Sequence, residues 1–241
     1  LQEGNDMDSY FVEIQRPFMP PSDDARLVLI ADGSLHRALE DVKRHLFSCV
    51  KYAKKHGVYV LTGLFAHEGN LCLCLLDPGG EVVCRQPAIH PSISFQGEFL
   101  PGDRIEVAHV GELGNVCLCV DCDINDSRVL RAAALKGADV ALSVQALDPV
   151  QDAGERLLRT VWSGAQGNNL YVVNIAAGSA AVACPAGVTR AGDGYLIRQT
   201  SSFPVRFGLN MARLDEIRRG LRLLEQINPA LIANYEAELG R

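Results

Sequence analysis

Hydrophobic and polar positions follow two periods along this chain, one typical of buried strands and the other of amphipathic helices. Short apolar runs such as Leu27–Ala31 predict strands that are covered on both faces. A helical period follows this run, with Ser34 as a plausible N-cap and Gly57 as the stop. The apolar positions of this first helix are Leu35, Leu39, Val42, Leu46, Cys49 and Ala53.

A hairpin is predicted next, because the apolar segments Asn70–Leu76 and Glu81–Cys84 flank Asp77-Pro78-Gly79-Gly80, whose residue types favour a tight turn. Further on, a helix between two apolar runs implies a right-handed parallel crossover. The other predicted strands and helices are Tyr59–Gly63, Asn115–Asp121, Ser127–Lys136, Val140–Val144, a helix carrying Leu157 to Ala165, Leu170–Ala177, hairpin strands to about Thr200 and a helix from Asn210 to Glu225. This alternation indicates a layered α/β fold.

Composition excludes several classes of function. The length of 241 residues and the 48% hydrophobic content allow one sizeable core. A net charge of -6 argues against a nucleic-acid partner and against a polybasic membrane surface, since both need clustered positive charge. The longest apolar stretches, such as Leu71–Leu76, are far shorter than the ~20 residues that span a bilayer, so no membrane association is expected.

The eight cysteines favour buried thiols over disulfides. Cys72 and Cys74, and likewise Cys117 and Cys119, alternate within apolar runs that are typical of buried strands. A C-x-C pair inside a strand has no turn that could fold both thiols around a metal ion. We therefore expect reduced thiols, a cytoplasmic protein and no cofactor.

Five segments between residues 56 and 173 share one further property. In order they resemble the signatures of the nitrilase, or carbon–nitrogen hydrolase, superfamily: His56–Gly63 (HGVYVLTG), Leu75–Pro91 (LLDPGGEVVCRQPAIHP), Gly97–Asp103 (GEFLPGD), Ala134–Val140 (ALKGADV) and Asn168–Val173 (NNLYVV). The resemblance implies a four-layer α-β-β-α sandwich whose protomers usually dimerise through their helices. It makes residues 25–241 the hydrolase-like domain and residues 1–24 an extension. The family's N-terminal strand and helix are then expected to be short or missing, because Arg16–Asp24 is rich in proline.

The family hydrolyses nitriles or amides with a glutamate base, a lysine that stabilises the tetrahedral intermediate and a cysteine nucleophile. Carried over one by one, these roles fall on Asp32, Ala88 and Asp121, while Glu98 matches an additional glutamate of the family site. Alanine cannot replace an ammonium group, and an aspartate could attack an acyl carbon only through an anhydride. The resemblance therefore predicts a catalytic site that is inactive in the standard reaction.

Two other interpretations of these residues remain open. Cys122 could serve as a displaced nucleophile if a bulge shifted the strand end by one residue, although the lysine would still be missing. If Asp32, Glu98 and Asp121 converge, their charges require a cation such as Mg²⁺ or Ca²⁺, an amine ligand, an arginine or a retained proton. The simpler alternative is an acidic pocket, solvated or paired with arginine, at a site that has lost its catalytic function.

Three functions compete at this point. The first is a non-hydrolytic binding or scaffolding subunit with a small-molecule ligand or a protein partner, which would form a homodimer through a surface that includes Ser127–Lys136. The second is an amidohydrolase-type enzyme that uses Cys122 or carboxylate and metal chemistry. The third is an ordinary amidase whose triad lies elsewhere in the chain, which a lysine ammonium beside a cysteine sulfur would reveal.

Overall fold

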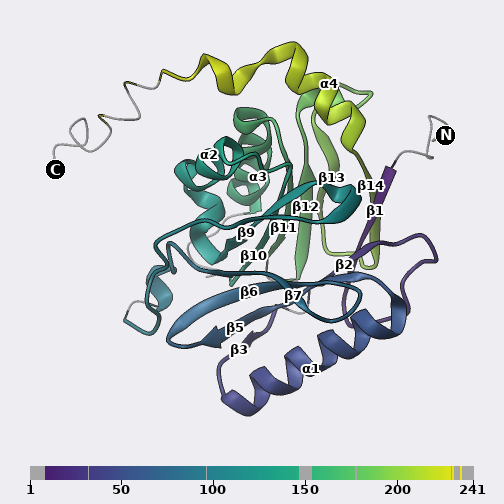
Figure 1. Ribbon diagram of the computed structural model, residues 1–241, viewed down its shortest axis with the longest axis vertical. Helices are drawn as coiled ribbons and strands as arrows, with labels where there is room; N and C mark the ends of the chain where they lie inside the picture. The colour runs from purple at the N-terminus through teal and green to yellow at the C-terminus, as the bar shows by residue number, and fades with distance from the viewer. Residues whose placement is uncertain are drawn as a thin grey trace.

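Two β-sheets lie face to face in the computed structural model, and helices cover both outer faces (Figure 1). The structure describes residues 9–31, 33–95, 97–146, 154–176, 178–228, 230 and 234, without the side chains of 154–157. Within these residues sheet A has the strand order β14-β1-β2-β4-β6-β5-β3, with β7 beside β6. Its strands are β1 (Ser9–Gln15), β2 (Leu27–Ile30), β3 (Leu35–His36), β4 (Tyr59–Leu61), β5 (Leu64–His67), β6 (Asn70–Leu76), β7 (Val82–Pro87) and β14 (Val205–Asn210).

Sheet B has the strand order β13-β12-β11-β10-β9-β8. Its strands are β8 (Val107–His109), β9 (Asn115–Val120), β10 (Val140–Gln145), β11 (Tyr171–Ala176), β12 (Ser179–Ala183) and β13 (Tyr195–Thr200). β10 pairs in parallel with both β9 and β11, which confirms the predicted crossover. The predicted hairpin is also confirmed, because β6 and β7 pair in antiparallel fashion across a turn in which Gly80 has φ +77°.

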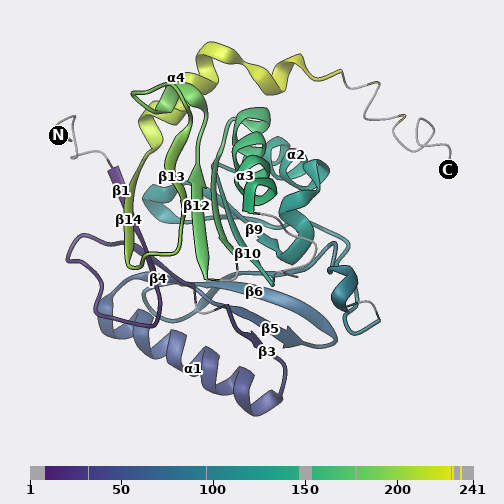
Figure 2. The same ribbon diagram turned by 180° about the vertical axis from the view of Figure 1, so that it is seen from behind.

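The layers run α-β-β-α, as predicted (Figure 2). Helix α1 (Leu39–His56) packs on the outer face of sheet A. Helices α2 (Ser127–Leu135) and α3 (Gly154–Asn168) pack on the outer face of sheet B, and α4 (Met211–Leu221) follows β14. The largest cluster of buried side chains lies between the two sheets. Within the described residues, no helix has the length and apolar character that crossing a bilayer requires.

Side chains alternate along β9 as the sequence predicted. Val116, Leu118 and Val120 belong to the core between the sheets, whereas Cys117 and Cys119 pack under α2 and α3. A hydrogen bond with Cys117 and burial raise the pKa of the Cys119 thiol, so this sulfur stays protonated at neutral pH. None of the eight cysteines forms a disulfide in the part of the chain that the structure describes. The buried thiols are structural groups.

Residues 9–15 form a full strand of sheet A, so the strand that was expected to be short or missing is present, while the described residues between β1 and β2 contain no helix. β1 pairs with β14 on one side and with β2 on the other, and residues 16–26 join β1 to β2 without a helix. Buried polar groups of β1 bind this connection. The side chain of Glu13 accepts hydrogen bonds from Gln15 and from the backbone of Ser22, and Gln15 also accepts from Tyr52 of α1. The loop is therefore fixed to the sheet by hydrogen bonds.

One local expectation was wrong. Ser34 does not cap the first helix, because Leu35 and His36 instead pair with β5 and the helix begins at Leu39. The predicted stop is correct, since Gly57 has φ +65° and its N–H bonds to Ala53 O. Arg218, on the last helix, is mostly buried and forms an ion pair with Asp139.

Candidate active site

A sharp turn ends β9 at Asp121, the residue aligned with the family's nucleophile. Asp121 has φ +56°, in the left-handed region that side chains rarely adopt, and it opens the short 3-10 helix Asp121–Asn125. Its side chain is only 1% exposed. The position of the nucleophile therefore lies on a strand-to-helix turn, as expected for a reactive residue, but it is closed to solvent.

Backbone N–H groups from three segments surround the carboxyl group of Asp121. Ser92 N donates to Oδ2 at 2.7 Å, and Ala146 N donates to Oδ1 at 3.2 Å. The N–H of Cys122 is the third donor. Burial raises the pKa of Asp121 to about 6, although the three hydrogen bonds favour the charged form. The nearby carboxylate of Asp123 adds to the rise.

Asp123 is a second buried carboxyl group, and it holds the segment that precedes Ser92. Its oxygens accept hydrogen bonds from the backbone N–H groups of Ile89, His90 and Val120. The imidazole of His90 lies between Asp123, at 3.4 Å from Nδ1, and Asp126, at 3.3 Å from Nε2. Burial raises the pKa of Asp123 against these contacts. Asp121 and Asp123 together fix residues 89–92 over the end of β9.

Ala88, the residue aligned with the family's lysine, is fully buried in the core between the sheets. Its N–H donates to Leu71 O at 2.8 Å, and its carbonyl accepts a hydrogen bond from Gly102 N at 2.7 Å. The backbone at this position is therefore fixed, and its methyl group supplies no charge to the site. A substrate carbonyl oxygen would find no cation at Ala88.

Glu98 lies at the surface of the molecule. Its carboxylate pairs with Arg37, with 2.6 Å between Nε and Oε1, and the guanidinium of Arg37 lies 5.5 Å from the ring centre of Phe95. Asp32 is outside the described residues, so the convergence of the three predicted carboxylates stays a prediction. Among the residues that are described, no three His, Cys, Asp or Glu side chains are grouped so that they could hold a metal ion.

Cys122 is half-buried at the second position of the 3-10 helix. The register of β9 against β10 is regular to Val120 and Val144, so the chain reaches this cysteine through the turn at Asp121 and not through a strand bulge. The backbone of Cys122 serves Asp121 as a hydrogen-bond donor. Its role as a displaced nucleophile stays a hypothesis.

Sequence reasoning missed three contributors to this site. Asp123 had a signal, because an aspartate two residues beyond Asp121 at the end of an apolar strand must find partners if it is buried. Ser92 and Ala146 had none, since they contribute backbone N–H groups that any residue type except proline carries. Only the fold brings these two amides together.

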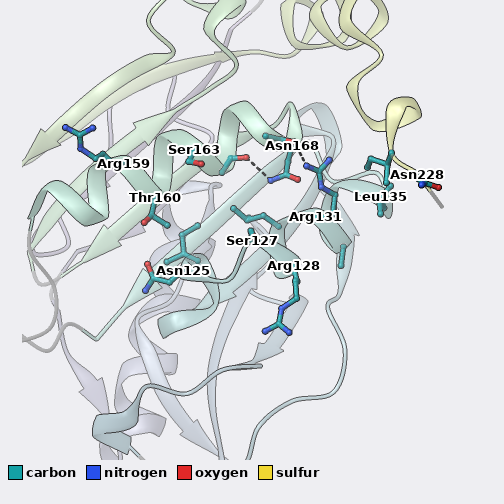
Figure 3. Close-up of a pocket in the computed structure, with 16 residues that line it drawn as sticks. Asn125, Ser127, Arg128, Arg131, Leu135, Arg159, Thr160, Ser163, Asn168 and Asn228 are labelled. Atoms are coloured by element: carbon teal, nitrogen blue, oxygen red, sulfur yellow. Dashed lines mark hydrogen bonds between the residues drawn. The ribbon is translucent and has the colours of Figure 1, made fainter. Parts of the chain in front are cut away.

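A separate groove of about 1030 Å³ lies between α2 and α3 on the outer face of sheet B (Figure 3). Leu130 and Gly164 line it, and at one end it is bounded by Ile227 and Asn228. Several of its polar atoms are buried without a hydrogen-bond partner among the described residues, namely both amide atoms of Asn125, Nη1 of Arg131 and Oδ1 of Asn168. Leu135 at its rim is 49% exposed. This face therefore has unmet hydrogen bonds and uncovered apolar surface.

Several solved structures of the nitrilase superfamily have a fold similar to that of this chain. A carbon-nitrogen hydrolase from Helicobacter pylori G27 superposes with a TM-score of 0.73 at 15% identity, over 97% of this chain and 99% of that chain. A Saccharomyces cerevisiae protein of branch 10 of the nitrilase superfamily gives 0.70 at 14% identity, over 91% and 96%. A mutant of an amidase of the nitrilase superfamily from Nesterenkonia AN1 gives 0.64 at 18% identity, over 95% and 98%.

Comparisons of sequence alone find no counterpart. No family model matches the chain, and no curated protein is significantly similar to it. The near-complete coverage of the structural matches shows that this chain has the fold of the nitrilase superfamily over its whole described length.

Proposed function

We propose that this chain is a nitrilase-superfamily protein that has lost Cys-dependent hydrolysis of amides and nitriles and acts as a binding or scaffolding subunit. One observation carries the proposal. The residue aligned with the nucleophile is a buried aspartate whose carboxyl group accepts hydrogen bonds from Ser92 and Ala146. A group engaged in this way is neither free to attack nor open to a substrate.

The chemistry of the neighbouring positions supports the same conclusion. Acyl transfer needs an activated nucleophile and a positive or hydrogen-bonding group for the developing oxyanion. Ala88 provides no ammonium group, and Glu98 is engaged with Arg37 at the surface. A carboxylate nucleophile would also have to pass through an anhydride, which is a worse route to amide hydrolysis than a thioester.

The groove between α2 and α3 supports a homodimer as the assembled form. A second copy placed on this face would cover Leu135 and could supply partners for the unsatisfied atoms of Asn125, Arg131 and Asn168. The face includes the region Ser127–Lys136, through which the family resemblance implies pairing. A small-molecule ligand or another protein remains the alternative occupant within the same proposal.

A cytoplasmic location fits the thiol chemistry. The eight cysteines form no disulfide within the described residues, and burial raises the pKa of Cys72 to about 11 and that of Cys74 to about 12. Thiols of this kind persist in a reducing compartment. We therefore place the proposed subunit in the cytoplasm.

The proposed loss of hydrolysis is tested with a panel of simple amides, nitriles and N-carbamoyl compounds. We expect the wild-type protein to release no more ammonia than a heat-killed control. Turnover that disappears in Cys122→Ser would instead support the displaced-nucleophile enzyme. Turnover that persists in Cys122→Ser but is removed by a chelator would support metal chemistry, and either result would overturn the proposal.

A further inference from the structure

The donors around Asp121 share one geometric property: they come from three separate segments and aim at one group. Ser92 follows β7, Cys122 opens the turn after β9, and Ala146 directly follows β10. All three donors are backbone N–H groups, so the arrangement belongs to the fold and does not depend on the identity of these side chains.

The segments that carry the donors are themselves held in place. Residues 89 and 90 are bonded to the carboxylate of Asp123, which also accepts the N–H of Val120. Ala146 follows a strand that pairs on both sides with neighbours in sheet B. Asp123 and the pairing of β10 therefore hold the segments next to Ser92 and Ala146 independently of the side chain at residue 121.

The donor set fits a carboxylate. Two of the N–H groups approach different oxygens of Asp121, Ser92 at Oδ2 and Ala146 at Oδ1, so a planar anion with two oxygens satisfies both. A single spherical anion would have to choose between them. Each of these buried N–H groups needs an acceptor, because an unsatisfied buried donor costs free energy.

We propose that the backbone N–H groups of Ser92, Cys122 and Ala146 form a binding site for one carboxylate, and that this chain fills the site with its own Asp121 side chain. The contact is autoinhibitory, since a carboxylate or an acyl oxygen from outside must displace a covalently attached competitor. The inference rests on these contacts alone and does not depend on the proposed loss of hydrolysis.

The test removes the internal occupant. Glycine suits residue 121, because it adopts φ +56° without the penalty of a side chain. In Asp121→Gly, sodium formate or acetate should bind saturably and raise the Tm by about 3–6 °C at ten times its Kd. Sodium chloride at equal ionic strength should not. Wild type and Asp103→Gly, which removes an aspartate that is 88% exposed, serve as controls without a vacated site.

The outcomes separate cleanly. The inference is overturned if formate does not raise the Tm of Asp121→Gly. It is also overturned if chloride, or formate with either control protein, raises the Tm by as much. If Asp121→Gly does not fold, the wild-type protein decides by NMR: the amide protons of Ser92 and Ala146 should titrate with the midpoint of the Asp121 carboxyl carbon, and should not do so in Asp121→Asn. The inference is also overturned if the chemical shifts of these amide protons do not follow the titration of Asp121. Hydrolysis by wild type would contradict the proposed function and leave these readouts unchanged.

Discussion

At the scale of single residues, Asp121 links pH to stability. Its pKa is raised by burial from 3.8 to about 6, so between these values the native protein holds a proton that the unfolded chain has released. The stability from this group is fully present below pH 3.8 and is lost as pH rises through 6. A difference of about two pKa units corresponds to about 3 kcal/mol.

We therefore expect the free energy of unfolding of wild type, measured by urea titration, to fall by about 2 kcal/mol relative to Asp121→Asn between pH 4 and pH 7. The isosteric variant is the reference, because it keeps the shape of the side chain and removes the titration. If the difference between the two proteins stays constant with pH, folding does not raise the pKa of Asp121, and if wild type instead gains stability relative to Asp121→Asn as pH rises, folding lowers that pKa.

The three substituted positions make a second prediction at this scale. Asp32→Glu, Ala88→Lys and Asp121→Cys are each expected to leave the protein without measurable hydrolysis, because residues that act as one catalytic unit are strongly non-additive. Only the triple variant should recover traces of amide hydrolysis. Activity in any single variant, measured as ammonia release, would mean that the remaining two positions are not defective.

At the scale of elements, Arg218 fixes α4 to the end of sheet B. Its guanidinium pairs with Asp139 and donates to the carbonyl oxygens of Ala138 at 2.6 Å and Asn169 at 2.7 Å. Arg218→Ala should lower the free energy of unfolding by about 2–4 kcal/mol, since it leaves a partly buried carboxylate without its partner. Arg219→Ala is the matched control and should cost less than about 0.5 kcal/mol. Equal effects in urea titrations would show that α4 is docked by other contacts.

Elements with a regular apolar pattern could be predicted from the sequence. Elements whose secondary structure depends on contacts with distant residues could not. β9, α2 and β10 were predicted because apolar runs and a helical period leave one interpretation. β1 was missed, since Glu13 and Gln15 interrupt its apolar pattern and find their partners in the following loop and in α1. Leu35 and His36 were predicted to be helical. They form a strand only because they pair with β5, which lies nearly thirty residues later in the chain.

The candidate site also has some features that the sequence predicted and others that it could not. The alignment of Asp121 with the nucleophile needed only the spacing to Ala134–Val140, and the structure places this residue on a sharp turn. Its burial and its partners could not be predicted, because the amides of Ser92 and Ala146 are indistinguishable in sequence from other backbone amides. The pairing of Glu98 with Arg37 could not be predicted either, because no motif had linked Arg37 to the site.

At the scale of the whole molecule, the proposed homodimer makes a prediction about α2. Wild type should sediment as a dimer at micromolar concentration, with a total buried area of at least ~1,200 Å². Leu135→Asp should shift it to monomer, because a carboxylate at the rim of the groove would be desolvated in the interface. Leu39→Asp on the opposite layer is the control, since Leu39 is 66% exposed on α1. A monomeric wild type, or two variants that behave alike, would remove the groove as the dimer surface.

The central claim is that the fold of a carbon–nitrogen hydrolase is present without its reaction. The most direct measurement is a single-turnover assay, in which the protein is in molar excess over a simple amide and released ammonia is followed for a day. This format detects even one chemical event per site and does not depend on product release. The account predicts ammonia at the level of buffer alone. Release that approaches one equivalent per molecule of amide and is abolished by Asp121→Asn would contradict it.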